Sequence, residues 1–290
     1  MDATTRTLAV ADAEIVHHVH GPLPPADGAP ALLMIGQPMT SEGFGELAAR
    51  FPDRTVITYD PRGLGASRRA DGRTDNSPQT QAEDLHALIG DVGGPVEIFA
   101  SSGGAVTGLA LVAAHPEDVS VLVAHEPPLL RILPDAEAAV RAEAAVTEAY
   151  RRRGWGAGMA AFIAMVTWPG EFGDAFASRP LPDPARFGLP EADDGSREDP
   201  LLSGTSAAIT GYLPDVEALG RASTRVVIAV GEESAGVLTG RTARAAAELL
   251  GTEPVVLPGG HGGFHTLDPM HPGRPGPFAE RLREVLAGAR

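Results

Sequence analysis

The apolar residues of this chain fall into short continuous runs separated by segments with helical spacing. Four such runs lie in the first half of the chain, at 31–35, 55–59, 96–100 and 119–124. These runs do not alternate with polar residues, so we expect strands that are buried on both faces, as in a parallel sheet. Helices are predicted between them, at 42–50, 79–92 and 104–115.

The same alternation returns near the end of the chain. Strands are predicted at 225–230 and 254–257, and helices at 241–250 and 277–287. Two further strands, at 5–10 and 14–20, open the chain. Strands that alternate with helices are typical of an α/β fold. We therefore predict a mostly parallel, eight-stranded sheet flanked by helices.

The alternation lapses between residues 128 and 223. This span begins with an Ala/Glu/Arg-rich helix at 135–152, and a stretch rich in Pro, Gly and Asp follows. A disordered linker is the alternative, but disordered segments contain few aromatic residues. This span contains Trp155, Phe162, Trp168, Phe172, Phe176 and Phe187. We therefore predict a helical cap at 128–223, inserted into a core made of residues 1–127 and 224–290.

The composition removes several classes of chemistry. The chain of 290 residues has no cysteine, which excludes disulfides, thiolate nucleophiles and cysteine-ligated metal sites. It has no lysine, which excludes a Schiff-base lysine and the lysine of a phosphate-binding loop. The formal net charge of −15 argues against nucleic acid as a partner, because that binding depends on basic groups. We predict no metal site and no cofactor.

We expect neither a secretory signal nor a membrane-spanning segment. Its first residues have neither the basic nor the apolar region of a secretory signal. No apolar run approaches the ~18 residues that a membrane span needs. We expect a soluble, cytoplasmic protein without membrane contacts, and a homodimer is compatible with the sequence.

The strongest chemical signal is the segment Ala100-Ser101-Ser102-Gly103-Gly104, where a predicted strand runs into a predicted helix. Small residues two positions on either side of Ser102 match the nucleophile elbow, a turn so sharp that larger side chains would collide. Ser101 is the competing hydroxyl, but its neighbour at two positions is the large Phe99. Ser102 is therefore the predicted nucleophile.

Two further motifs follow strands and carry a resemblance to the α/β-hydrolase superfamily. Ile35-Gly36-Gln37 stands where that family commonly has His-Gly after a strand, so Ile35 replaces the usual histidine. The resemblance implies an oxyanion hole formed by the backbone N–H groups of Gln37 and Gly103. The stretch 60–67 is similar to the family's D-x-R-G-x-G-x-S segment, whose role is structural.

The glycine-framed segment Gly259-Gly260-His261-Gly262-Gly263 lies between the last predicted strand and the last helix. In the family this is the place of the catalytic histidine, so His261 is predicted to be the general base. His265 and His271 lie nearby but outside the glycine frame. The order of serine before histidine matches the α/β hydrolases.

The acid of the triad has two candidates. Many relatives place aspartate at the position of Ser234, which cannot serve. Glu233 is one position earlier, and Glu126 ends the strand beside the one that carries Ser102. We favour Glu126, because Pro127 and Pro128 stiffen the loop that follows it, and we predict a hydrogen bond of ~2.6–3.2 Å to His261.

Together these residues predict a serine hydrolase that cleaves a small hydrophobic ester, lactone or thioester through an acyl-enzyme. The cap is expected to supply an apolar pocket from Met159, Phe162, Met165 and Trp168. The alternative is a non-hydrolytic member of the fold, acting as a ligand-binding or cyclisation scaffold in secondary metabolism.

Overall fold

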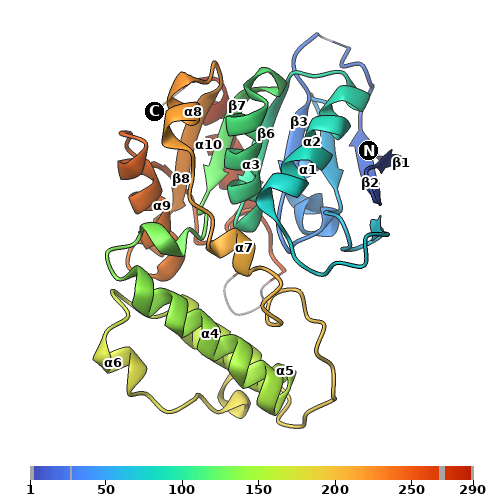
Figure 1. Ribbon diagram of the computed structural model, residues 1–290. Helices are drawn as coiled ribbons and strands as arrows, with labels where there is room; N and C mark the ends of the chain where they lie inside the picture. The colour runs from blue at the N-terminus through green and yellow to red at the C-terminus, as the bar shows by residue number, and fades with distance from the viewer. Residues whose placement is uncertain (1–2, 27, 268–271, 289–290) are drawn as a thin grey trace.

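The computed structural model describes residues 3–26, 28–267 and 272–288. A single sheet forms its centre, with the strand order β1-β2-β4-β3-β6-β7-β8-β9 and with β5 paired to β2 (Figure 1). The strands are β1 (Ala3–Val10), β2 (Ala13–His20), β3 (Leu32–Ile35), β4 (Val56–Tyr59), β5 (Arg68–Arg69), β6 (Val96–Ser101), β7 (Val119–His125), β8 (Arg225–Gly231) and β9 (Val255–Leu257).

The six strands from β3 to β9, apart from β5, are parallel, and β1, β2 and β5 are antiparallel to their neighbours. The sheet is therefore mostly parallel, as predicted. The described residues form nine strands instead of the predicted eight. The additional strand, β5, has two residues, which is too short to leave a periodic pattern in the sequence.

Helices cover both faces of the sheet, and this explains the continuous apolar runs. Successive strand residues point to opposite faces. Ile98 and Ala100 join the core under α2, α3 and α9, whereas Phe99 joins the core under α1 and α10. The helices are α1 (Gly45–Ala48), α2 (Pro78–Val92), α3 (Gly103–Ala114), α4 (Ala136–Arg153), α5 (Trp155–Val166), α6 (Asp174–Ala177), α7 (Ala207–Thr210), α8 (Val216–Arg221), α9 (Leu238–Leu249) and α10 (Pro275–Leu286).

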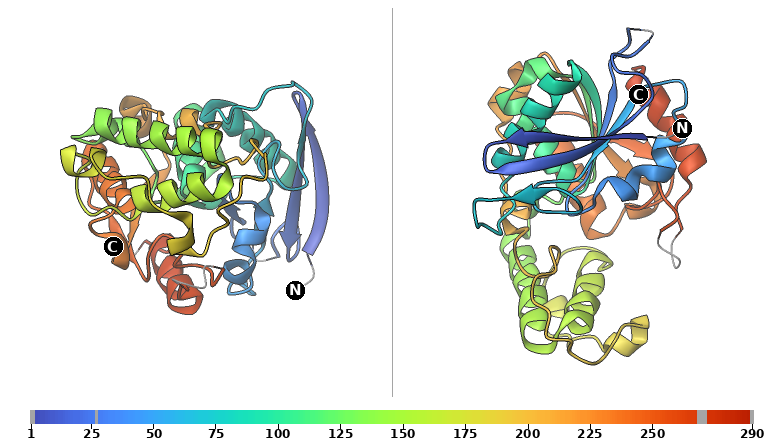
Figure 2. Two further views of the ribbon diagram at one scale, coloured as in Figure 1. Left: turned by 90° about the horizontal axis from the view of Figure 1, so that it is seen from below. Right: turned by 90° about the vertical axis from the view of Figure 1, so that its right-hand side faces the viewer.

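The segment between β7 and β8, residues 128–223, is called the helical insertion below. Its helices α4 and α5 pack together beyond one end of the sheet, while the β1–β2 hairpin lies at the lateral edge (Figures 1 and 2). A separate apolar cluster, which includes Ala142, Val146 and Met165, holds α4 and α5 together. The last two helices of the insertion return to the sheet, since Ile209 of α7 and Leu219 of α8 belong to its core.

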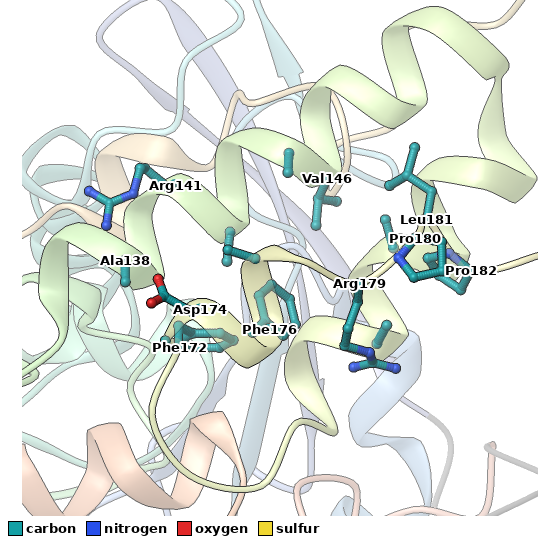
Figure 3. A pocket seen from close by; sticks show the side chains of 16 residues that line it. Ala138, Arg141, Val146, Phe172, Asp174, Phe176, Arg179, Pro180, Leu181 and Pro182 are labelled. Atoms are coloured by element: carbon teal, nitrogen blue, oxygen red, sulfur yellow. The ribbon is translucent and has the colours of Figure 1, made fainter.

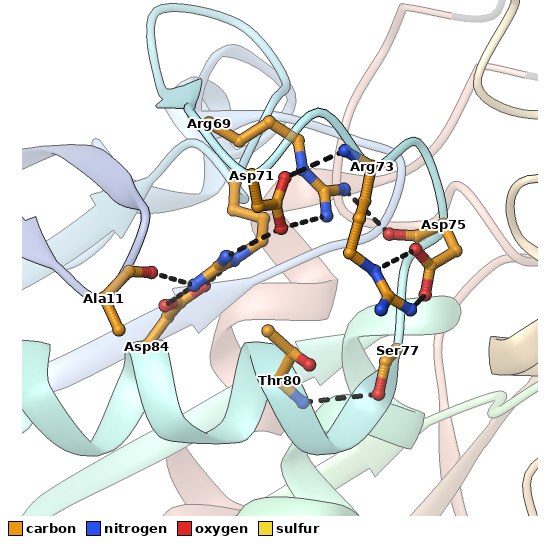
Figure 4. Close-up of polar contacts among 9 residues, drawn as sticks. Ala11, Arg69, Asp71, Arg73, Asp75, Ser77, Thr80 and Asp84 are labelled. Carbon is orange, nitrogen blue, oxygen red and sulfur yellow. Dashed lines mark hydrogen bonds and ion pairs between the residues drawn. The ribbon is translucent and has the colours of Figure 1, made fainter.

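The loop after β4 is held by charged side chains. Arg62 donates from Nε and Nη2 to the Asp84 carboxylate, at 2.7 and 2.6 Å, and both side chains are buried. Arg69 binds Asp71 in the same two-pronged way, and Arg73 binds Asp75 (Figure 4). Bidentate pairs of this kind fix geometry strongly, so this network anchors the loop to α2.

No helix among the described residues is long and apolar enough to cross a bilayer.

Candidate active site

Ser102 lies at the junction of β6 and α3, in the middle of the parallel strands. Its backbone has φ 57° and ψ −129°, a conformation that costs a non-glycine residue on the order of 1–3 kcal/mol. Its N–H donates to the carbonyl of His125 on the neighbouring strand, at 2.9 Å. A Cβ on Gly104 would lie 2.5 Å from the Ile35 carbonyl oxygen. The turn therefore excludes a larger residue at Gly104, as the sequence motif predicted.

The neighbouring hydroxyl of Ser101 faces the other way. Ser101 is 1% exposed, and its Oγ lies 3.1 Å from Nδ1 of His125, which is also buried. The side chains of the two neighbouring serines thus point in different directions. Of the two, only Ser102 lines the large cavity described below.

A carboxylate and an imidazole meet on the wall of the cavity that Ser102 also lines. Oε2 of Glu126 lies 2.7 Å from Nδ1 of His261, within the range predicted for this pair. The other oxygen, Oε1, accepts the N–H of Gly231 at the end of β8, at 2.8 Å. Glu126 is completely buried, and its φ of 50° turns the chain out of β7. Both carboxylate oxygens therefore have fixed partners, and the imidazole is held in one orientation.

The environment of Glu126 favours its charged form. Burial alone would raise the pKa of this carboxyl. The hydrogen bond with His261, the nearby ring of His125 and a hydrogen bond from the Ser234 hydroxyl outweigh burial and hold the pKa of Glu126 well below its usual range. The group at this position is therefore a carboxylate at neutral pH.

The competing acid, Glu233, also lines the cavity, but the carboxylate bonded to His261 is that of Glu126. Glu233 has a side chain that is 66% exposed, and its carboxylate is 3.9 Å from the guanidinium of Arg274. Ser234, which stands where relatives place aspartate, is buried and donates to Glu126. The sequence indicated only that Ser234 could not be the acid. Its supporting role depends on the distance between two loops, which no local pattern reveals.

His125 is a further residue of this site that the sequence reasoning missed. Its ring stacks beside that of His261, with centroids 5.9 Å apart and 20° between the planes. Complete burial lowers the pKa of His125 to about 4, although the nearby Glu126 carboxylate opposes this. The ring is therefore neutral at pH 7 and forms an uncharged wall behind His261. Its position directly before Glu126 was the available signal.

The two predicted oxyanion-hole residues lie together on the other side of Ser102. Gln37 and Gly103 both line the cavity, and a Cβ on Gly103 would be 2.7 Å from the Gln37 carbonyl oxygen. The first N–H groups of a helix have no acceptor within the helix, and this applies to Gly103 at the start of α3. The Gln37 N–H has no acceptor among the described residues. Both N–H groups are thus available to a ligand oxygen.

A cavity of about 860 Å³ separates these residues from the helical insertion. Ser102 and His261 line one wall, and α4 and α5 contribute to the other. Large apolar side chains that line it come from Leu130, Val140, Val146, Phe162, Met165, Val166, Leu201, Ile209, Val237 and Leu238. Two of the four residues predicted for an apolar pocket, Phe162 and Met165, are part of this lining.

Most of the aromatic residues of the helical insertion lie away from the large cavity. Of the six, only Phe162 lines the large cavity. Phe172 and Phe176 line a second cavity of about 400 Å³ between α4, α5 and α6 (Figure 3), and Trp168 packs against Phe176. Met159 and Trp168 line neither cavity. Met159 and Trp168 instead pack against the apolar cluster that holds the helical insertion together.

One group in the described chain has the side chains of a metal site. His86, His115 and Asp118 have ligand atoms within 4.8 Å of one another, near the C-terminal end of α3 and far from Ser102 at its other end. Each histidine already has a carboxylate partner, however: Asp118 at 2.6 Å from His86, and Glu83 at 3.0 Å from His115. These two pairs account for the cluster without a metal ion.

Comparison with known proteins places the chain among hydrolases. Residues 18–280 match the model of the alpha/beta hydrolase family. Over 135 residues the chain is 36% identical to the uncharacterized hydrolase YraK of Bacillus subtilis (strain 168). That match covers 46% of this chain and 48% of the relative, so the chain spans about half the length of the curated protein it matches.

Similar solved structures cover nearly the whole chain. A thermophilic esterase from Thermogutta terrifontis has 22% identity and a TM-score of 0.62, and the match covers 99% of this chain and 98% of that one. The enol-lactonase from Burkholderia xenovorans LB400 has 18% identity and a TM-score of 0.63, covering 97% and 100%. A putative epoxide hydrolase from Pseudomonas aeruginosa has 18% identity and a TM-score of 0.61, covering 98% and 95%. At these identities the likeness establishes the fold.

Proposed function

Because the chain belongs to the alpha/beta hydrolase family, we propose that it is a serine hydrolase acting on a small hydrophobic ester, lactone or thioester. One observation carries this proposal: the buried Glu126 carboxylate holds His261 at 2.7 Å on the wall of the cavity that Ser102 also lines. This arrangement has the parts that acyl transfer requires, namely a nucleophile, a base and a group that orients the base.

The first half of the reaction forms an acyl-enzyme. Because Nδ1 of His261 is bound to Glu126, Nε2 is the atom that takes the proton of the Ser102 hydroxyl. The oxygen of Ser102 attacks the carbonyl carbon, and the N–H groups of Gly103 and Gln37 stabilise the negative oxygen. His261 then gives its proton to the departing alcohol or thiol. Glu126 stays ionised and stabilises the imidazolium, as its low pKa favours.

The second half releases the acid. Water enters the cavity, His261 removes a proton from it, and the hydroxide attacks the acyl carbon. The bond to Ser102 breaks, and its oxygen takes the proton back from His261. In this proposal the helical insertion acts as a cap whose apolar residues bind the hydrophobic part of the substrate.

The choice of an ester over an epoxide rests on the residue at the elbow. The resemblance implies that epoxide hydrolases and haloalkane dehalogenases use aspartate as the nucleophile, whereas this chain has Ser102 at that position. An alkoxide on serine forms an ester that water can cleave by the route above. We therefore expect turnover of p-nitrophenyl esters and none of styrene oxide.

Reaction with a fluorophosphonate probe tests the proposal. We expect the protein to be labelled on the tryptic peptide that contains Ser102, and Ser102→Ala to abolish the labelling. Ser101→Ala is the matched control, because the Ser101 hydroxyl is buried against His125 and the variant should still be labelled. If the wild type bound hydrophobic esters but was neither labelled nor able to cleave them, the result would favour a non-hydrolytic scaffold. The presence of Ile35 where the family commonly has histidine is the observation that favours this alternative.

A further inference from the structure

Helix α4 presents two different faces. Ala139, Ala142 and Ala149 are buried in the cluster that holds α4 and α5 together. A second set of residues lines the large cavity, with spacings of three and four that place them on one side of the helix. This set contains Val140, Glu143, Ala144, Thr147 and Glu148. On this side of α4, Glu143 is surrounded by the small or apolar side chains of Val140, Ala144 and Thr147. Its carboxyl therefore reaches the cavity.

Glu143 differs from the other acidic groups of this cavity because it has no cationic partner. Glu148 pairs with Arg151 and Arg152, and Glu233 is 3.9 Å from Arg274. Among the described residues, no ion pair involves Glu143.

Among the described residues, the polar group recorded beside the Glu143 carboxyl is the Thr210 hydroxyl of α7, and that hydroxyl also donates to the Ala207 carbonyl at 3.3 Å. Burial raises the pKa of the Glu143 carboxyl. A partly buried carboxylate costs free energy unless a positive group or several donors compensate it. Thr210 offers one donor, so the group is incompletely compensated in the protein alone.

The cavity also has an overall preference for one sign of charge. Three glutamates line it, and no arginine does among the described lining residues, while the chain has no lysine. An anionic substrate would meet repulsion there, and a positive group would be attracted. Because Glu148 and Glu233 already have arginine partners, this attraction comes chiefly from Glu143.

We propose that Glu143 binds a protonated amine of the substrate, at the end remote from the bond that Ser102 cleaves. The substrate class is then an ester, lactone or thioester whose apolar chain ends in an ammonium group. This inference rests on the proposed hydrolase function for the position of the cleaved bond, but the binding of the amine does not depend on turnover. Glu143 is a specificity residue and has no part in bond cleavage.

Turnover of three matched esters tests the preference. We expect the wild type to favour p-nitrophenyl 6-aminohexanoate over p-nitrophenyl hexanoate, and to disfavour the mono-p-nitrophenyl ester of adipic acid. Glu143→Gln should reduce the amine-to-neutral ratio of kcat/KM about tenfold, the size of a hydrogen bond to a charged group. The change should appear mainly in KM, because the amine is bound similarly in the ground and transition states.

Two control variants separate substrate binding from a structural role. Glu137→Gln makes the same charge change on the same helix at a side chain that is 95% exposed, and it should keep the wild-type ratio. Thr210→Val removes the hydrogen bond but leaves the carboxyl, and it should also keep the ratio. If Thr210→Val reproduced the loss seen in Glu143→Gln, the carboxyl would serve to join α4 to α7 and the inference would be overturned.

A binding measurement separates this inference from the hydrolase proposal. Calorimetry on Ser102→Ala should give a dissociation constant about tenfold lower for hexylamine than for hexan-1-ol. The preference should disappear in the double variant Ser102→Ala/Glu143→Gln. If the protein preferred hexylamine but cleaved none of the esters, the amine site would be supported and the hydrolase proposal would be rejected. If it cleaved esters but showed no preference for the amine, the hydrolase proposal would be supported and the amine site would be rejected.

Discussion

The two walls of the large cavity differ in what fixes their residues. On the sheet wall, Ser102 and Glu126 directly follow the adjacent strands β6 and β7, and His261 lies four residues after β9 ends at Leu257. Strand pairing sets their spacing, because Ser101 is aligned with His125 in the register of β6 and β7. On the insertion wall, side-chain positions depend on how α4 and α5 pack against each other. A sequence can therefore place the proposed triad more easily than the residues proposed to contact the substrate.

The largest effect should come from the sheet wall at Ser102. Ser102→Ala removes the nucleophile, and we expect kcat for an ester substrate to fall by about 10⁶, the order measured when a catalytic serine is lost. Its melting temperature should stay close to that of the wild type, because the hydroxyl faces the cavity. Steady-state kinetics and a thermal melt check this. Substantial activity in Ser102→Ala would place the nucleophile elsewhere.

The next effect distinguishes the two candidate acids. Glu126→Gln keeps the shape of the side chain but loses the charge that stabilises the imidazolium, so kcat should fall by up to ~10⁴. Glu233→Gln, at an exposed side chain near Arg274, should change kcat by less than about threefold, as expected for a surface substitution. Measuring both variants on one ester compares a buried and an exposed carboxylate directly. The opposite ranking would assign the role to Glu233.

A smaller effect concerns the pH dependence of the free energy of unfolding, to which the buried His125 contributes. The pKa of His125 falls from 6.5 to about 4 on folding, so the unfolded chain binds the proton first as the pH drops. The contribution of His125 is then complete above pH 6.5 and decreases as the pH falls toward 4. At about 1.4 kcal/mol per pKa unit, the free energy of unfolding should decrease by about 3 kcal/mol across this range.

Urea unfolding at several pH values measures this effect. His125→Asn removes the titrating group and should have a shallower dependence of unfolding free energy on pH between 6.5 and 4 than the wild type. Equal slopes in the two proteins would mean that His125 is already accessible to protons in the folded state.

The smallest effect is expected on the insertion wall, where two phenylalanines line different cavities. Phe162 lines the large cavity and Phe176 lines the smaller one. Phe162→Ala should lower kcat/KM for a hydrophobic ester about tenfold, as the loss of apolar contact with a substrate does. Phe176→Ala should lower the melting temperature, because Phe176 packs against Trp168 and Phe172, but it should leave kcat/KM within about twofold, because Phe176 does not line the cavity of Ser102. Equal kinetic effects would mean that the two cavities serve one substrate.

The outcome of the sequence predictions follows this same division. The parallel strands were predictable because each is mostly apolar on both faces, and the elbow because Gly104 has no room for a larger side chain. Helix α5 could not be oriented in the same way, since its residues Trp155–Val166 are almost entirely apolar and offer no polar side to set its direction. The predicted helix at 42–50 is instead a 3₁₀ turn, Ser41–Phe44, followed by the one-turn α1.

The site contains the same contrast. Glu126 was predicted from its place at a strand end, and its hydrogen bond to His261 is present at 2.7 Å, while the catalytic roles remain predictions. Ser234 and Glu143 interact with segments far away in the chain, at Glu126 and Thr210 respectively. Such contacts depend on the packing of loops and helices, which short-range patterns do not encode.

The helical insertion leaves the sheet at β7 and returns at β8, and these strands are hydrogen-bonded neighbours, with Val121 aligned to Arg225. For a segment whose ends already lie side by side, each doubling of length adds only about 0.6 kcal/mol of closure entropy. The sheet therefore tolerates changes of length in the part of the insertion that contains α4, α5 and α6, whereas Ile209 of α7 and Leu219 of α8 belong to its core. Evolution or a protein engineer can exchange the part from α4 to α6, while the register that aligns Ser101 with His125, the residues directly before Ser102 and Glu126, stays unchanged.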